Sequence, residues 1–248
     1  MLAEARVGTS GFAYREWIGT VYPPDVTPGE LLPYYAQRLT TVEIASTSSR
    51  LPRPEQMAAW GRSVPSGFQF ALKLPSRISA EIRAARAAAR SMGAFLDATE
   101  NLGENLGPIL VHLPPTFAAD RTALADFLRA MPGGLRFAFE FGHPSWREEA
   151  TLRVLSAHNA ALVLSDHGEG VPRIDLTADF TYVRIQRDDD RPDAWAAWAE
   201  KLAILTHRGV DVYAYVKHDR KGLAVERALR LSALLRTQYD AGEQSLMT

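Results

Sequence analysis

The stretch RFAFEFGHPSW, from Arg136 to Trp146, decides how the rest of the chain is interpreted. An apolar run that follows Gly133–Gly134 and ends at Gly142 is typical of a buried strand. It carries one carboxylate, Glu140, at or near its end, where the strand meets water. Because charged side chains are rarely buried without a partner or a purpose, Glu140 is either structural or part of the chemistry.

Similar short apolar runs recur along the chain and alternate with longer segments of helical period. We expect strands at Ala5–Gly11, Thr41–Ser46, Gln69–Leu74, Ile109–Leu113, Arg136–Phe141, Ala161–Asp166, Phe180–Gln186 and Asp211–Lys217. We expect helices at Pro28–Leu39, Pro54–Ser63, Ala80–Leu102, Arg121–Met131, Ser145–His158, Asp193–His207 and Gly222–Thr237.

The connection between Asp166 and Phe180 breaks this pattern. It reads HGEGVPRIDLTA, which is too short and too rich in turn residues for a full helix. Eight β/α units in a chain of 248 residues match the count and size of a (β/α)8 barrel. We therefore predict an α/β fold, a single-domain TIM-type barrel over 1–248, with the helix after the sixth strand reduced to a loop.

A dinucleotide-binding fold is less consistent with the sequence. The glycines of GTSG, which begin at Gly8, lack the G-x-G-x-x-G spacing that cradles a pyrophosphate. A doubly wound sheet of that kind also usually has fewer strands. We expect no nucleotide cofactor.

The composition excludes several classes of function. The chain has no cysteine, so disulfides, zinc-thiolate sites and a cysteine nucleophile are excluded. The formal net charge is −1, which gives no global field for attracting nucleic acid or an anionic membrane. No signal peptide and no apolar run of about 20 residues is present, so we expect a cytoplasmic protein without a membrane partner.

In a parallel barrel the functional side chains lie at the C-terminal ends of the strands. Glu140 and Asp166 come from neighbouring predicted strands, which lie about 4.8 Å apart. Two such carboxylates can share a proton or a water, which suits general acid/base chemistry. The alternative is that each is a structural ion-pair partner of Arg184 or Lys73.

Cations at other strand ends suggest an anionic ligand. Lys73, Arg184, Arg187 and Lys217 lie at or near predicted strand ends, and barrels often bind phosphate after strands seven and eight. The competing interpretation is that Arg187 is solvated within QRDDDRPD while Arg184 neutralises a carboxylate. Glu43 and His112 are two further candidate ligand contacts at strand ends.

Aromatic residues follow the first predicted strand. Tyr14 and Trp17 can stack on sugars or bases, a contact worth about 1–3 kcal/mol per base, or they can simply plug the barrel or pack under a neighbouring loop. A metal site made from His112, Glu140, Asp166 and His218 is conceivable. No tight spacing motif such as H-E-x-x-H supports it, so we expect no metal.

Seven motifs in order make the chain similar to the YecE-like family, also called domain of unknown function 72. They are GTSGFAYREW (Gly8–Trp17), TTVEIASTSSRLP (Thr40–Pro52), GFQFALKLPSRIS (Gly67–Ser79), GPILVHLPPTF (Gly107–Phe117), FAFEFGHPSW (Phe137–Trp146), YVRIQ (Tyr182–Gln186) and VYAYVKHD (Val212–Asp219). The resemblance implies a TIM-type barrel and no established reaction.

The chain also departs from the pattern that this resemblance implies. The departures fall at Ala45, Ser48, Ser49, Ser79, Ala80, His112, Gly142, Gln186, Arg187, Lys217 and His218. The residues that match it and could act at the barrel mouth are Glu43, Arg50, Lys73, Glu140, His143, Asp166 and Arg184. Most departures alter polar or aromatic groups, so the chain acts on a different ligand or its ancestral chemistry has decayed.

We predict an enzyme, a hydrolase or isomerase, that acts on a small-molecule or phosphorylated ligand. Glu140 and Asp166 would be catalytic, and the ligand contacts would be Glu43, Lys73, His112, His143, Arg184, Lys217, Tyr14 and Trp17. The alternative is a non-catalytic binding protein for single-stranded or damaged nucleic acid. An enzyme requires a deep closed pocket, whereas a nucleic-acid binder requires an open basic groove.

Overall fold

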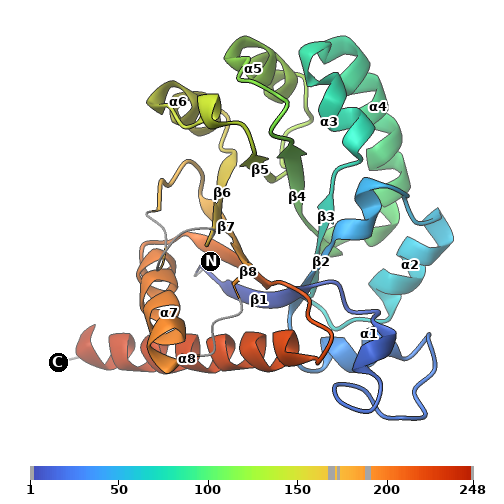
Figure 1. Ribbon diagram of the computed structural model, residues 1–248, viewed down its shortest axis with the longest axis vertical. Helices are drawn as coiled ribbons and strands as arrows, with labels where there is room; N and C mark the ends of the chain where they lie inside the picture. Colours follow the sequence, from blue (N-terminus) through green and yellow to red (C-terminus); the bar gives the residue numbers. More distant parts are fainter. Residues whose placement is uncertain (1–2, 167–170, 172–173, 188–190, 247–248) are drawn as a thin grey trace. The chain divides into compact units, whose positions relative to one another are not determined.

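The computed structural model describes residues 3–166, 171, 174–187 and 191–246. Eight parallel strands follow one another in sequence order around a closed barrel (Figure 1), which confirms the predicted TIM-type fold. The strands are β1 (Ala5–Ser10), β2 (Thr41–Ile44), β3 (Gln69–Lys73), β4 (Leu106–Leu113), β5 (Phe137–Phe141), β6 (Ala161–Ser165), β7 (Phe180–Ile185) and β8 (Asp211–Val216).

Helices separate most of the strands along the chain, as the alternating pattern predicts. They are α1 (Leu31–Ala36), α2 (Pro54–Arg62), α3 (Ser76–Ala80), α4 (Ala85–Thr99), α5 (Arg121–Arg129), α6 (Glu149–Ala157), α7 (Pro192–His207) and α8 (Leu223–Leu246). In the connection between β6 and β7, residues 171 and 174–179 form no helix, and 167–170 and 172–173 lie outside the described residues.

Three predicted helices differ clearly from the observed ones, and one of them, α8, runs to Leu246 instead of ending at Thr237. The segment Ala80–Leu102, predicted as one helix, is divided among α3, α4 and short 3-10 turns, with non-helical backbone at Ala84. The segment Ser145–His158 begins with a 3-10 turn, Pro144–Trp146, and α6 starts only at Glu149. In this last segment the N-terminal residues are held by the loop contacts described below.

The chain forms two compact units. The first comprises Met1–Val42, Leu164–Ile174 and Asp179–Thr248, and the second comprises Glu43–Val163 and Asp175–Ala178. In the first unit α7 and α8 pack side by side, and α8 also packs against β1 (Figure 1). In the second unit α5 packs against α6.

The aromatic pattern of β5 explains which face of this strand is buried. Phe137 and Phe139 contact Phe127 of α5, and Phe141 stacks on Trp146. Successive side chains of a strand point to opposite faces, so Glu140 points away from these aromatic residues. Helices surround the strands of a TIM barrel, and Glu140 therefore lies on the face toward the barrel interior.

Thr177 supports the start of β6 from the connection that lacks a helix. Its hydroxyl donates to the carbonyl oxygen of Ala160 at 2.7 Å and accepts the backbone N–H of Leu162 at 3.0 Å. The side chain is buried. A single hydroxyl thus satisfies two backbone groups at the strand entrance.

We expect Thr177→Val to lower the free energy of unfolding by about 1–3 kcal/mol, since it removes the partner of a half-buried N–H and of a buried carbonyl. Valine keeps the shape of the side chain and removes only the hydroxyl. Urea unfolding measures the loss. Thr177→Ser keeps the hydroxyl and is the control; equal losses in both variants would contradict the assigned role.

Candidate functional site

Three ionisable side chains lie together on the barrel-facing side of the second unit. In the register of the sheet His112 of β4 is paired with Glu140 of β5, and Lys73 of β3 is paired with Leu110. Paired residues of parallel strands point the same way, and Leu110 and His112 share one face of β4. Lys73, His112 and Glu140 therefore share the face opposite α5, and all three are half-buried.

These residues occupy the C-terminal ends of three consecutive strands. His112 and Glu140 are the penultimate residues of β4 and β5, and Lys73 is the last residue of β3. Neighbouring strands are about 4.8 Å apart, which brings the imidazole and the carboxylate within reach of one small ligand. His112 and Glu140 each also interact with other parts of the protein, so neither is an isolated group.

Glu43 is the most deeply buried of the predicted site residues, with 0% of its surface exposed. It is the third residue of β2 and, like His112 and Glu140, it interacts with other groups of the protein. The chain then enters a 3-10 turn, where the hydroxyl of Thr47 lies 2.7 Å from the carbonyl oxygens of both Ile44 and Lys73. This contact joins the end of β2 to the end of β3 and fixes the backbone of Lys73.

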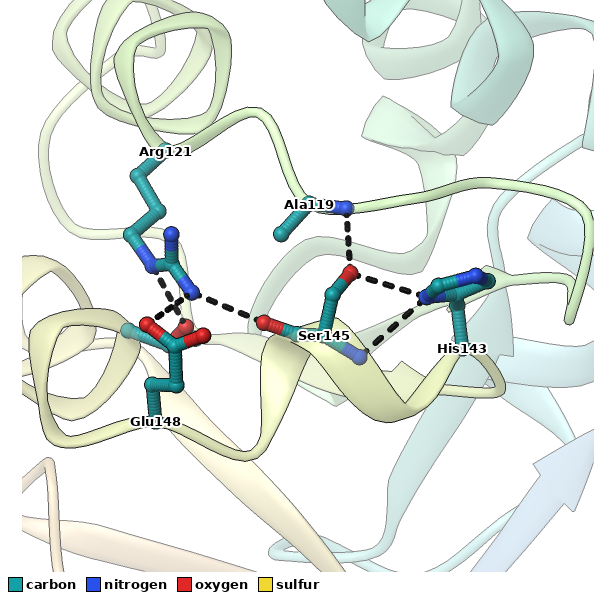
Figure 2. A network of polar contacts seen from close by, with 6 residues as sticks. Ala119, Arg121, His143, Ser145 and Glu148 are labelled. Carbon is teal, nitrogen blue, oxygen red and sulfur yellow. Dashed lines mark hydrogen bonds and ion pairs between the residues drawn. The ribbon is translucent and has the colours of Figure 1, made fainter.

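The loop after β5 is held by a network around Ser145 (Figure 2). The Ser145 hydroxyl lies 2.8 Å from His143 Nδ1 and accepts the backbone N–H of Ala119 at 2.8 Å. The guanidinium of Arg121 donates to the Ser145 carbonyl oxygen at 2.7 Å and forms an ion pair with Glu148 at 2.8 Å. The sequence predicted His143 as a ligand contact. It did not indicate Ser145 or Arg121, because the contacts between the loop after β5 and the segment that leads into α5 form only in the folded chain.

In the first unit, Arg184 is the penultimate residue of β7 and is paired in register with Tyr215 of β8. Arg184 is half-buried and interacts with other groups of the protein. Lys217 follows β8 directly and is exposed; its backbone N–H donates to Ile185 at 2.8 Å. Of these two predicted anion contacts, Arg184 interacts with its surroundings, and Lys217 is anchored to the end of β7 through its backbone.

The aromatic loop after β1 packs against the segment that follows β8. Trp17 is 0% exposed, and its indole N–H donates to the Asp219 carbonyl oxygen at 2.8 Å. Tyr14 stacks on His218 with ring centroids 3.6 Å apart, and His218 Nε2 lies 3.3 Å from a carboxylate oxygen of Glu16. These contacts pack the aromatic loop against the segment that follows β8.

Asp166 follows β6 and binds the end of β7. Its two carboxylate oxygens accept the backbone N–H groups of Gln186 at 2.7 Å and Arg187 at 3.3 Å, and the residue is 4% exposed. It also lines a cavity of about 180 Å³ against α7, together with Arg187, Arg191, Trp195 and Trp198. Asp166 and Glu140 belong to different units, so their catalytic pairing stays a prediction.

Two further features bear on cofactors and membranes. Among the residues that the structure describes, no group of three or more His, Asp or Glu side chains is arranged to hold a metal ion. Within the same residues, no helix combines the length and the apolar character needed to cross a bilayer.

A closed barrel with ionisable side chains at the C-terminal ends of its strands defines a TIM-type barrel protein. The chain belongs to the family described as protein of unknown function DUF72, whose model matches residues 6–247. UPF0759 protein YecE of Escherichia coli (strain K12) is 28% identical over 198 residues, which cover 68% of this chain and 72% of that protein.

Solved structures of the same family share the fold. The crystal structure of a DUF72 family protein from Thermotoga maritima MSB8 matches with a TM-score of 0.81 and 25% identity, covering 94% of this chain and 99% of that one. A DUF72 family protein from Enterococcus faecalis V583 matches with a TM-score of 0.75 and 20% identity over 94% and 95% of the two chains. The family supplies the fold and leaves the reaction open.

Proposed function

We propose that this protein is an enzyme, a hydrolase or isomerase, that acts on a small anionic or phosphorylated ligand at the ends of β3, β4 and β5. The observation that carries the proposal is the register of the sheet, which pairs His112 with Glu140 on the barrel-facing side and sets Lys73 on the same face. A base, an acid and a cation in one small area suit proton transfer on an anionic substrate.

The two central residues complement each other chemically. Glu140 as a carboxylate accepts a proton from a substrate carbon, a hydroxyl or a water, and His112 returns a proton to the product. Positioned acid/base groups of this kind accelerate reactions by about 10²–10⁴-fold. Lys73 stabilises negative charge on the ligand, because its half-buried ammonium acts in an environment of lower dielectric than water.

We expect millimolar inorganic phosphate to raise the melting temperature of the wild type, because it binds to the folded state. Such binding raises the free energy of unfolding by RT ln(1 + [L]/Kd). At a concentration about 100 times the Kd this is a stabilisation of about 2.7 kcal/mol. Lys73→Met is expected to abolish the increment. Lys221→Met, which removes an exposed lysine after β8, is expected to keep it.

The comparison has to be made at constant ionic strength, with chloride replacing phosphate, because phosphate also stabilises proteins by exclusion from their surface. Exclusion acts on all three proteins alike. An increment of the same size in wild type and Lys73→Met would therefore contradict an anion site at Lys73.

Turnover is tested with a panel of small phosphorylated compounds followed by ³¹P NMR. A compound that is converted by the wild type should still bind to Glu140→Gln, which keeps the size of the side chain, but its conversion should fall by about 10²-fold or more. Conversion that survives Glu140→Gln would exclude this residue as the base.

A further inference from the structure

The contacts of His143 determine which of its ring nitrogens carries the proton. The backbone N–H of Ser145 points at His143 Nδ1 from 3.2 Å, and a backbone N–H can only donate. Nδ1 is therefore the acceptor and carries no hydrogen. In a neutral imidazole the hydrogen must then be on Nε2.

A second donor strengthens this assignment. The Ser145 hydroxyl accepts the N–H of Ala119, so its own hydrogen is free to point at Nδ1, 2.8 Å away. Nδ1 thus receives the backbone N–H and the hydroxyl of the same serine. A hydrogen on Nδ1 would face both donors, which leaves the tautomer with hydrogen on Nε2 as the one that fits.

Ser145 is in turn held from the other side. Arg121, the first residue of α5, donates to the Ser145 carbonyl oxygen and to the Thr151 hydroxyl, 3.2 Å away, and pairs with Glu148. Figure 2 shows Arg121 and His143 on opposite sides of Ser145, so the serine links the guanidinium to the imidazole. The imidazole is fixed in both position and tautomer before any ligand arrives.

Nε2 of His143 is the ring nitrogen that remains available to bind a ligand. Both of its hydrogen bonds use Nδ1, and in the described part of the chain no other group bonds to the ring. The residue is half-buried and lies three positions after Glu140, in the loop that follows the same strand. A preorganised N–H in such a place costs little to align with an acceptor.

We propose that His143 is a neutral hydrogen-bond donor that binds an oxygen of the ligand, a phosphoryl or carboxylate oxygen, through Nε2–H, and that Ser145 is the positioning residue that fixes its tautomer. This deepens the proposed function and rests on an anionic ligand binding near Glu140. It assigns the recognition of the ligand's acceptor atoms to the loop that follows β5, the strand that carries Glu140.

The test uses the whole ¹⁵N-labelled chain and long-range ¹H–¹⁵N spectra, with inorganic phosphate as the probe. The chain has six histidines, and His143→Gln assigns the signals of this one. In the free wild type we expect the Nε2–H tautomer. Phosphate should shift the Nε2 resonance and leave the Nδ1 resonance nearly in place.

Three variants separate positioning from general damage to the fold. Ser145→Ala keeps the backbone N–H that Nδ1 accepts and should keep the Nε2–H tautomer, but it removes the hydroxyl contact that orients the ring. It should therefore weaken phosphate binding about tenfold, the size expected for one hydrogen bond to a charged group. Ser145→Thr keeps the hydroxyl and should preserve the wild-type affinity for phosphate. Ser156→Ala removes an exposed hydroxyl from α6 and should change neither signal.

A proton on Nδ1 in the free wild type would overturn the inference, as would an Nε2 resonance that phosphate leaves unmoved. The second outcome, combined with phosphate stabilisation that depends on Lys73, would overturn the inference and leave the proposed function standing. A shift of Nε2 in wild type and Lys73→Met alike would support His143 as the donor and contradict the role of Lys73.

Discussion

Gly8→Ala is expected to lower the free energy of unfolding by at least about 4 kcal/mol, which puts it among the most damaging single substitutions. A Cβ at this position of β1 would overlap the Thr41 carbonyl oxygen and lie 2.7 Å from its carbonyl carbon and 3.1 Å from the Tyr35 hydroxyl. The first two atoms are backbone and belong to β2. They can move only if the pairing of the strands around them is disturbed.

Gly93→Ala is the matched control, because a Cβ at this position of α4 would meet no atom within 4 Å. Alanine is the better helix former, so this variant should be more stable than the wild type by about 0.5–1 kcal/mol. Urea unfolding measures both changes, and circular dichroism shows whether Gly8→Ala folds at all. A Gly8→Ala protein within 1 kcal/mol of the wild type would contradict the close approach of the two strands.

Alkaline conditions are expected to destabilise the protein through two buried tyrosines. Burial raises the pKa of Tyr35 and of Tyr22 above the ordinary value, and for Tyr22 the neighbouring Tyr35 raises it further. Both hydroxyls donate to backbone oxygens, Tyr35 to Thr41 at 3.0 Å and Tyr22 to Phe12 at 2.6 Å. The folded state therefore keeps both phenols protonated where the unfolded chain has lost these protons.

The sign of the effect follows from proton counting. Above the unfolded pKa of about 10 the unfolded chain binds fewer protons than the folded one, so stability falls as the pH rises. At about pH 11 each tyrosine should cost about 1.4 kcal/mol relative to neutral pH, and the two together about 2.8 kcal/mol. Below about pH 9 neither contributes to the pH dependence.

Urea unfolding at about pH 9 and pH 11 tests this prediction in the wild type, Tyr35→Phe and Tyr22→Phe. Each variant loses a hydrogen bond and starts from a lower stability, but its loss between the two pH values should be smaller by about 1.4 kcal/mol. The lysines and the remaining tyrosines titrate equally in all three proteins, so their contributions to the pH dependence cancel in the comparison. The same pH dependence in all three would show that neither phenol is protected.

The strands could be predicted from the sequence because each one carries its own apolar run. In β5 the residues Phe137, Phe139 and Phe141 all face α5 and Trp146, a pattern of period two that is visible without the structure. The start of β4 was missed. The predicted strand begins at Ile109, whereas β4 begins at Leu106 and includes Gly107, where a Cβ would lie 3.2 Å from the Phe70 carbonyl oxygen.

The break between α3 and α4 could not be predicted from local sequence. The Ala/Arg segment around Ala84 is a good helix former throughout, yet the backbone there is not helical. Arg83 lies over the ring of Phe117 at 4.0 Å and donates to the Ala118 carbonyl oxygen at 2.9 Å. Contacts with a loop more than thirty residues away outweigh the local preference.

For the candidate site, the sequence by itself determined that Lys73, His112 and Glu140 lie at or near strand ends, because the apolar runs stop there. Only the tertiary structure decided that His112 is paired with Glu140 and that Lys73 shares their face. It also decided that Arg121 and Ser145 hold His143. Strand register and loop contacts depend on backbone hydrogen bonds and packing between segments far apart in the chain, which no local pattern encodes.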